Sequence, residues 1–193
     1  MPYKLINSTN RIQMDIFAHG LWTGALYKTL NKKVGKPLKV WPAIFWGTFP
    51  DLFAFAPAFI WLSWNLFLGS TNISDLPRPE EIEPTTRNIT PIFRLTSLLY
   101  NISHSAIIFL IIFGIVFLIF RRPVWELGGW FIHIVIDIPT HSYRFFPTPF
   151  LWPLSEWKIS GFPWANPFFL IPNYIAIIIV YFLLRKNKKS KSG

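Results

Sequence analysis

The sequence contains no cysteine, so it forms no disulfide and offers no thiolate ligand to a metal. Any metal bound by this chain must be held by histidine and carboxylate side chains. Charge is also scarce: only 15% of the 193 residues are charged, whereas 52% are hydrophobic and 19% are aromatic. This is more apolar than an ordinary soluble domain of the same length. The composition therefore favours an integral membrane protein.

Long apolar runs predict the fold class. Residues 105–120 and 167–184 contain no charged side chain, and about 20 apolar residues are enough for a helix to cross a bilayer. We expect an all-α fold, a polytopic membrane helical bundle of about five hydrophobic helices with a polar His/Asp cluster in its interior. The expected segments are approximately 12–30, 40–68, 93–120, 124–141 and 167–184.

Proline divides the second of these segments. Pro42, Pro50 and Pro57 are expected to break or kink it, and one part could be re-entrant rather than spanning. The segments between the apolar runs are too short to hold a soluble module. We therefore predict one membrane-embedded domain over residues 1–184, followed by a basic tail at 185–193.

The 19 basic residues outnumber the 9 acidic ones, and their distribution predicts an orientation. Twelve of them lie in three places, namely Lys28, Lys32, Lys33, Lys36 and Lys39, then Arg121 and Arg122, and finally Arg185, Lys186, Lys188, Lys189 and Lys191. Acidic residues gather between them in the 69–92 segment. This alternation follows the positive-inside rule and predicts a cell or inner membrane protein with a cytoplasmic C-terminal tail. We expect membrane lipids as partners and no nucleic acid; the oligomeric state stays open.

Ionisable residues inside the apolar segments are the unusual feature of this sequence. In HIVIDIPTH (133–141), His133 and Asp137 are four residues apart and so share one face of a helix. Such groups are costly in lipid unless they are paired or bound to a metal. All four histidines of the chain lie at or within apolar segments. The central set comprises three histidines and three aspartates: Asp15, His19, Asp51, His104, His133 and Asp137.

Imidazole and carboxylate groups suit zinc and similar divalent ions, so the set predicts a metal site. Each member also has a simpler interpretation. A lone intramembrane histidine is often an interhelical hydrogen-bond partner, Asp51 could cap a helix after Pro50, and Asp15 could lie at the membrane interface. The occurrence of every histidine near an aspartate favours the metal site.

Four blocks of the sequence carry a resemblance to a known family. They are DIFAHGLWTGAL (15–26), GTFPDLF (47–53), ISHSAIIF (102–109) and HIVIDIPTHS (133–142), with a weaker fifth block, FLWPLSEWKISG (150–161). In this order they resemble the membrane-bound metal-dependent hydrolases, a family distantly similar to zinc-dependent phospholipase C and zinc-dependent single-strand nucleases.

The resemblance implies a ligand set and roles. It gives His19, Asp51, His104, His133 and Asp137 as metal ligands, with Asp137 bridging two ions and His19 holding the second. Asp15 would orient His19, and Ser105 and Thr140 would support the ligands from a second layer. His141 has no counterpart in the pattern and could be a further ligand.

The expected activity is metal-dependent hydrolysis of an ester, most plausibly a lipid or other membrane-associated phosphoester. One or two divalent ions, zinc first, would activate water, with Asp51 and Asp137 as the catalytic carboxylates and Asp51 as general base. No nucleophilic serine motif or glycine-rich phosphate loop competes for the role. The alternatives are a non-catalytic metal-ion carrier or channel and a structural membrane adaptor, both using the same polar cluster.

Overall fold

The computed structural model describes residues 15–34, 37–69, 91–143, 146–162, 164 and 166–189. Most of the acidic 69–92 segment, Lys36 and the last four residues of the expected tail lie outside them. The described residues form six α-helices and no strand, which confirms the all-α fold class. The helices are α1 (Ile16–Leu30), α2 (Val40–Phe67), α4 (Pro91–Ser103), α5 (Ala106–Phe120), α6 (Gly128–Thr140) and α7 (Pro167–Lys189), with a 3-10 turn η2 (Trp125–Leu127) before α6.

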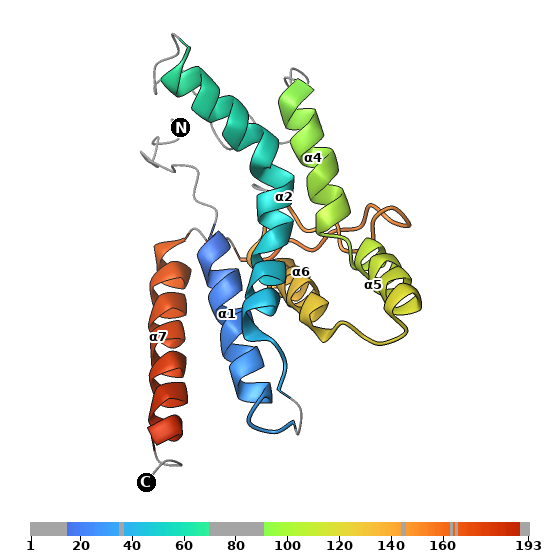
Figure 1. Ribbon diagram of the computed structural model, residues 1–193. Coiled ribbons are helices and arrows are strands. Elements are labelled where there is room, and N and C mark those ends of the chain that lie inside the picture. The colour runs from blue at the N-terminus through green and yellow to red at the C-terminus, as the bar shows by residue number, and fades with distance from the viewer. Residues whose placement is uncertain are drawn as a thin grey trace.

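Helix α2 lies at the centre of the bundle, in contact with α1, α4 and α6 (Figure 1). Small residues let these backbones approach one another closely. A side chain at Gly129 of α6 would clash with the carbonyl oxygen of Ala43 in α2, and one at Gly47 of α2 would clash with Thr23 of α1. Close packing of this kind is typical of helices that associate within membranes.

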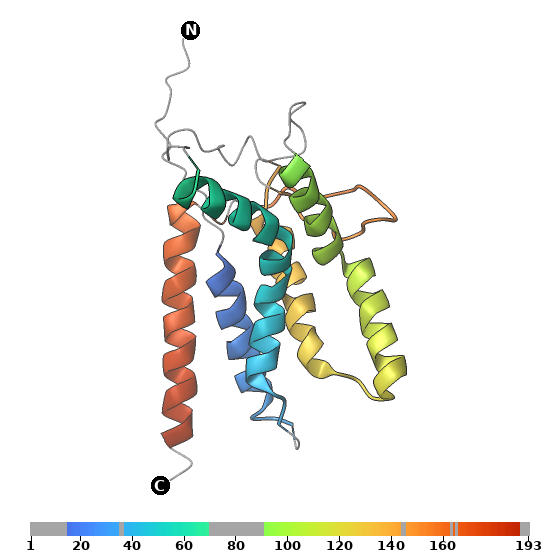
Figure 2. The same cartoon turned by 45° about the horizontal axis from the view of Figure 1, so that its top comes forward.

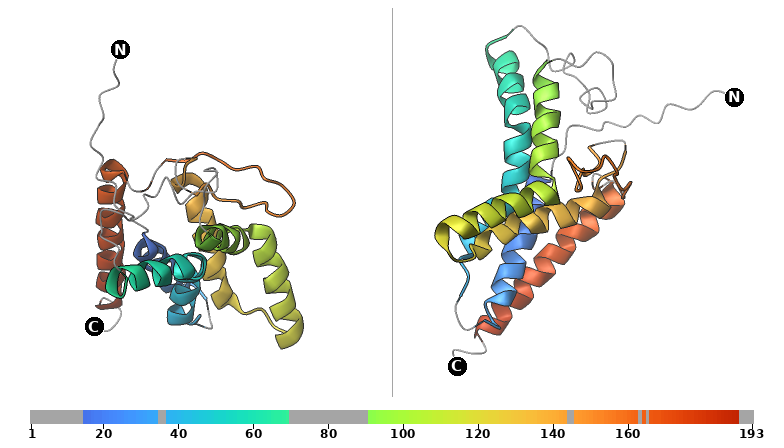
Figure 3. Two further views of the ribbon diagram at one scale, coloured as in Figure 1. Left: turned by 90° about the horizontal axis from the view of Figure 1, so that it is seen from above. Right: turned by 90° about the vertical axis from the view of Figure 1, so that its right-hand side faces the viewer.

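The prolines do not divide α2 into two helices. Pro50 and Pro57 both lie inside one continuous helix of 28 residues, which bends along its length (Figure 2). Pro42 lies in the first turn, where the missing N–H has no intrahelical partner to lose. After the bend, the second half of α2 runs beside α4, as the right-hand view of Figure 3 shows.

The expected segment 93–120 is wrong as a single helix. It consists of α4 and α5, which meet at an angle of 63°. The chain breaks at Ser105, whose side chain accepts a hydrogen bond from the Ile108 N–H at 3.1 Å and so caps the start of α5. The break places His104 in the interior of the bundle rather than along a straight helix face.

Among the described residues, two helices, α2 and α7, are long and apolar enough to cross a membrane, or three if α4 and α5 together form one broken span. Helices α1 and α6 have 15 and 13 residues, fewer than the roughly 20 of a straight span. The expected number of about five spans therefore stays a prediction. Helix α7 also continues to Lys189, five residues beyond the expected boundary at 184.

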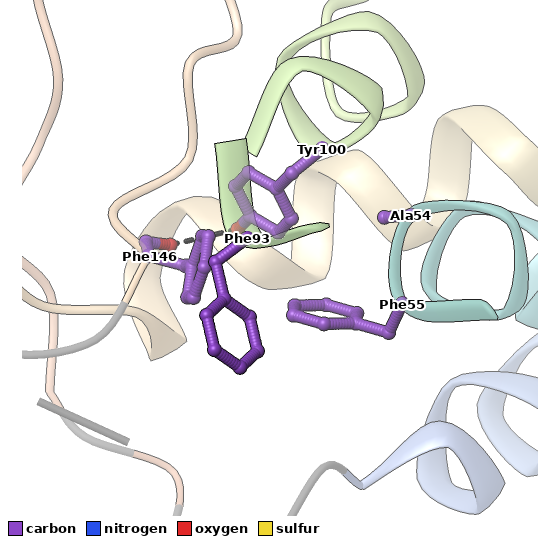
Figure 4. Close-up of a cluster of buried hydrophobic side chains, with 5 residues drawn as sticks. All are labelled: Ala54, Phe55, Phe93, Tyr100 and Phe146. Carbon is purple, nitrogen blue, oxygen red and sulfur yellow. Dashed lines mark hydrogen bonds between the residues drawn. The ribbon is translucent and has the colours of Figure 1, made fainter. Parts of the chain in front are cut away.

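An aromatic cluster fills the space between the second half of α2 and α4. It joins Ala54 and Phe55 of α2 to Phe93 and Tyr100 of α4 and to Phe146, which follows α6 (Figure 4). The Tyr100 hydroxyl donates to the Phe146 carbonyl oxygen at 2.7 Å, so the only polar end of the cluster is satisfied. Tyr100 also stacks on His104, with ring centroids 3.8 Å apart. The cluster thus forms an apolar wall beside the histidine.

Candidate metal centre

Four buried side chains from three parts of the chain meet inside the bundle. Asp51 comes from α2, His104 from the junction of α4 and α5, and His133 and Asp137 from neighbouring turns of α6. Each offers one ligand atom, and these four atoms all lie within 4.8 Å of one another. Two imidazoles and two carboxylates at this spacing could hold a metal ion.

The distances centre on one oxygen of Asp137. Its Oδ2 atom lies 3.1 Å from His133 Nε2 and 3.2 Å from His104 Nε2. The two Nε2 atoms are 3.1 Å apart. Asp51 Oδ1 closes the group at 3.4 Å from His104 Nε2 and 3.7 Å from His133 Nε2. The spacing of four between His133 and Asp137, which the sequence shows, places both on the same face of α6.

The outer nitrogens of the two histidines face backbone carbonyls. His133 Nδ1 lies 2.8 Å from the Gly47 oxygen, and His104 Nδ1 lies 3.1 Å from the Tyr100 oxygen and 2.9 Å from Ser103 Oγ. A carbonyl only accepts, so it assigns the proton of a neutral imidazole to Nδ1. Both Nε2 lone pairs then point into the cluster, as they do in histidines that bind a metal.

The carboxylate of Asp137 lies in the middle of the group, with imidazole nitrogens of His19, His104 and His133 at 3.1–3.2 Å from its oxygens. Both of its carboxylate oxygens are fully buried, and neither accepts a hydrogen bond within the described part of the chain. A buried carboxylate without hydrogen bonds is strongly unfavourable. A cation between Asp137, the inward lone pairs and Asp51 would offset this cost, so the donor set and its charge both fit a divalent ion.

Two further histidines lie on the other side of Asp137. His19 Nε2 of α1 is 3.2 Å from Asp137 Oδ1, and His141 Nε2, just after α6, is 4.0 Å from the same oxygen. The ring of His19 also packs against that of His133, with centroids 4.0 Å apart. The carboxylate of Asp137 therefore has imidazoles on both sides.

Three of the expected supporting residues have other roles. Asp15 does not orient His19, because the Nδ1 atom of His19 has no hydrogen-bond partner among the described residues. The Asp15 carboxylate instead caps α1 by accepting from the Ala18 N–H, and it also accepts from the Tyr174 hydroxyl at 2.6 Å. Ser105 caps α5 and donates to the Trp152 carbonyl. Thr140 donates to the Ile136 carbonyl within α6. The hydrogen bonds that the structure shows for these three side chains go to helix ends, backbone carbonyls and Tyr174, and none goes to a histidine of the group.

Gly47, Ser103 and Tyr100 contact the two histidines instead, and these contacts were not predicted from the sequence. Gly47 and Tyr100 act through backbone carbonyls, which no side-chain pattern reveals. Tyr100 lies four residues before His104, so helical spacing could have placed it on the same face. Its hydroxyl also lies 2.8 Å from His141 Nδ1.

Comparison with protein-family models, with curated proteins and with solved structures finds no match for this chain.

Proposed function

We propose that this chain is an integral membrane, metal-dependent hydrolase that acts on phosphoesters. The observation that carries the proposal is the set of four buried donors in which Asp137 has no hydrogen bond and two imidazole lone pairs face inward. Structural hydrogen bonding between helices would satisfy these atoms. A metal ion would satisfy them as ligands.

Zinc fits the donor set best. Two imidazole nitrogens and two carboxylate oxygens are suitable ligands for zinc, which would take water as a fifth ligand, and no thiolate is available to favour softer metals. A second ion could lie at Asp137 Oδ1 beside His19 and His141, with Asp137 bridging the two. The proposal thus covers a site of one or two metals.

Bound zinc would supply Lewis-acid activation of water and would neutralise charge on a phosphoryl group. The residues of the chain would do the rest. Asp51 is the general base in this proposal, because its side chain keeps slight exposure, 6% against 0% for Asp137, and a carboxylate at the edge of the cluster can take a proton from water. The position of the site among apolar helices favours a lipid phosphoester as substrate.

A metal-ion carrier would use the same donors, and a structural adaptor would use the same buried position. The carrier predicts movement of zinc across the membrane, and the adaptor predicts no bound metal at all. An adaptor would pair Asp137 with protonated histidines at the same 3.1–3.2 Å distances, so the metal content separates it from the other two. Only activity separates the hydrolase from the carrier.

The first experiment is elemental analysis of protein purified in detergent. Wild type should hold one to two zinc equivalents per chain, and His133→Ala and Asp137→Asn should lose them. Asp15→Asn is the matched control, because asparagine can also cap α1 and accept from Tyr174, and it should keep the metal.

The loaded protein is then assayed with a chromogenic phosphodiester and, in liposomes, for zinc uptake. Hydrolysis that is lost in Asp137→Asn and retained in Asp15→Asn supports the proposal. Zinc uptake without any hydrolysis would favour the carrier, and the absence of metal from wild type after addition of zinc would favour the adaptor.

A further inference from the structure

The basic residues of the described chain gather at one end of the bundle. Lys28, Lys32 and Lys33 lie at the end of α1 or just after it, and Lys39 precedes α2; Arg121 and Arg122 follow α5, and Arg185 and Lys186 lie near the end of α7. All eight are exposed. Figure 2 shows these helix ends together at the lower edge of the molecule. We call this the basic end; at the other end the described basic residues are Arg94 and Lys158.

The candidate metal centre lies far from the basic end. His19 is in the first turn of α1, eleven residues before Leu30, which corresponds to about 16 Å along the helix. Asp137 is in the last turn of α6, nine residues after Gly128, or about 14 Å. Helix α1 runs toward the basic end and α6 runs away from it. Both helices therefore place their site residues at a similar distance from the basic end.

Residues 146–162, which we call the strap, are tied across the end opposite the basic residues. At its start the Phe150 oxygen accepts from the Ala106 N–H at 2.9 Å, next to the break that holds His104. At its end the Phe162 N–H donates to the Pro139 oxygen at 2.8 Å, beside the end of α6. The strap therefore connects the two elements that carry His104 and Asp137.

The route from the site toward the basic end is closed by packing. Phe109, Leu127, Trp130 and Ile134 form a buried cluster around the first turns of α6, and Gly129 lies against the α2 backbone. Three residues of the site keep slight exposure, Asp51 with 4% among them. His19 and His141 each keep 7%, whereas His104 and His133 keep none.

We propose that the site opens to the extracytoplasmic side of the membrane, with the strap as its cover. Basic helix ends remain in the cytoplasm by the positive-inside rule, and the site and the strap lie at the opposite end. This orientation rests on the proposed function for its choice of site. It adds that the phosphoester would come from the extracytoplasmic leaflet or from solution on that side.

The absence of cysteine makes the orientation directly measurable. Single cysteines are placed at Ser160, an exposed residue of the strap, and at Val34, an exposed and uncharged position at the basic end. Spheroplasts producing either full-length variant are treated with a membrane-impermeant maleimide. Ser160→Cys should react in intact spheroplasts and Val34→Cys only after permeabilisation. The reverse pattern overturns the proposal.

A second measurement tests the opening of the site itself. Zinc-loaded protein is reconstituted in liposomes, and the fraction with the strap outward is determined by external labelling of Ser160→Cys. The fraction of the bound zinc that external EDTA removes should equal the fraction of protein with the strap outward. If the fraction of zinc removed instead equals the fraction of protein with Val34→Cys outward, the proposal is overturned. A chain that binds no zinc contradicts the proposed function, whereas the labelling of spheroplasts still decides the orientation of the strap.

Discussion

At the scale of single residues, neighbouring serines at the α4–α5 junction have different tasks. Ser103 Oγ lies 2.9 Å from His104 Nδ1 and 3.2 Å from the Pro50 oxygen. By donating to Pro50 it leaves a lone pair for the His104 N–H. Ser105 caps α5 and has no contact with His104 among the hydrogen bonds that the structure shows. Substitution of each serine by alanine should therefore affect different properties.

We expect Ser103→Ala to weaken zinc binding about tenfold, the lower end of what loss of a supporting hydrogen bond costs. Ser105→Ala should leave zinc affinity near that of wild type and lower the free energy of unfolding by about 1 kcal/mol, the usual effect of a lost helix cap. Competition with a zinc chelator measures the first property and denaturant unfolding the second. Equal zinc affinities for Ser103→Ala and wild type would show that Ser103 does not support His104.

The sequence predicts which residue types meet at the site better than it predicts what each one does. Histidine and aspartate are rarely tolerated in apolar segments without partners, so their presence alone points to the cluster. The role of Asp15 depends on where α1 begins, since a carboxylate one residue earlier than the helix becomes its cap. Helix ends are the least certain part of a sequence-based assignment, and the contacts that Asp15 makes depend on such an end.

At the scale of elements, the break between α4 and α5 could not be read from the local sequence. Neither proline nor glycine occurs at 104–105, and apolar residues continue on the other side. The bent junction is stabilised by the strap, because the Ala106 N–H donates to the Phe150 oxygen 44 residues away in the chain. Ser103, His104 and Ser105 are only moderate helix formers and serine is a common N-cap residue, so the local sequence permits a break, and the tertiary contact with Phe150 fixes it there.

Two glycines test how the packing of α6 positions the ligands. A Cβ atom at Gly129 would collide with the Ala43 carbonyl oxygen, and backbone cannot move aside as a side chain can. Gly129→Ala should push α6, with His133 and Asp137, away from Asp51. We expect a loss of about 2 kcal/mol or more in the free energy of unfolding, together with loss of bound zinc.

Gly114→Ala is the matched control, because a Cβ atom at Gly114 in α5 would meet nothing within 4 Å. There alanine should stabilise the helix by roughly 0.5–1 kcal/mol through its better helix propensity. Denaturant unfolding and zinc content of both variants are measured side by side. Unchanged zinc content in Gly129→Ala would mean that the close contact of α6 with α2 does not position the site.

At the scale of the whole molecule, a bound ion should hold the bundle together. Its donors come from α2, α6 and the α4–α5 junction, so unfolding of the bundle would have to break the metal site. A ligand that binds only the folded state at 100 times its dissociation constant stabilises that state by about 2.7 kcal/mol. For a chain of this size we expect zinc to raise the midpoint of thermal unfolding by roughly 5–10 °C.

The same measurement on two aspartate variants separates specific binding from a general effect of zinc. Asp137→Asn keeps the size of the side chain but removes the charge between the two inward lone pairs, so the zinc-dependent rise should disappear. Asp15→Asn should keep the full rise, because Asp15 contacts Tyr174 and the start of α1 instead of the cluster. An equal rise in both variants would mean that zinc stabilises the protein elsewhere, and Asp137 would then lose its place as the central ligand.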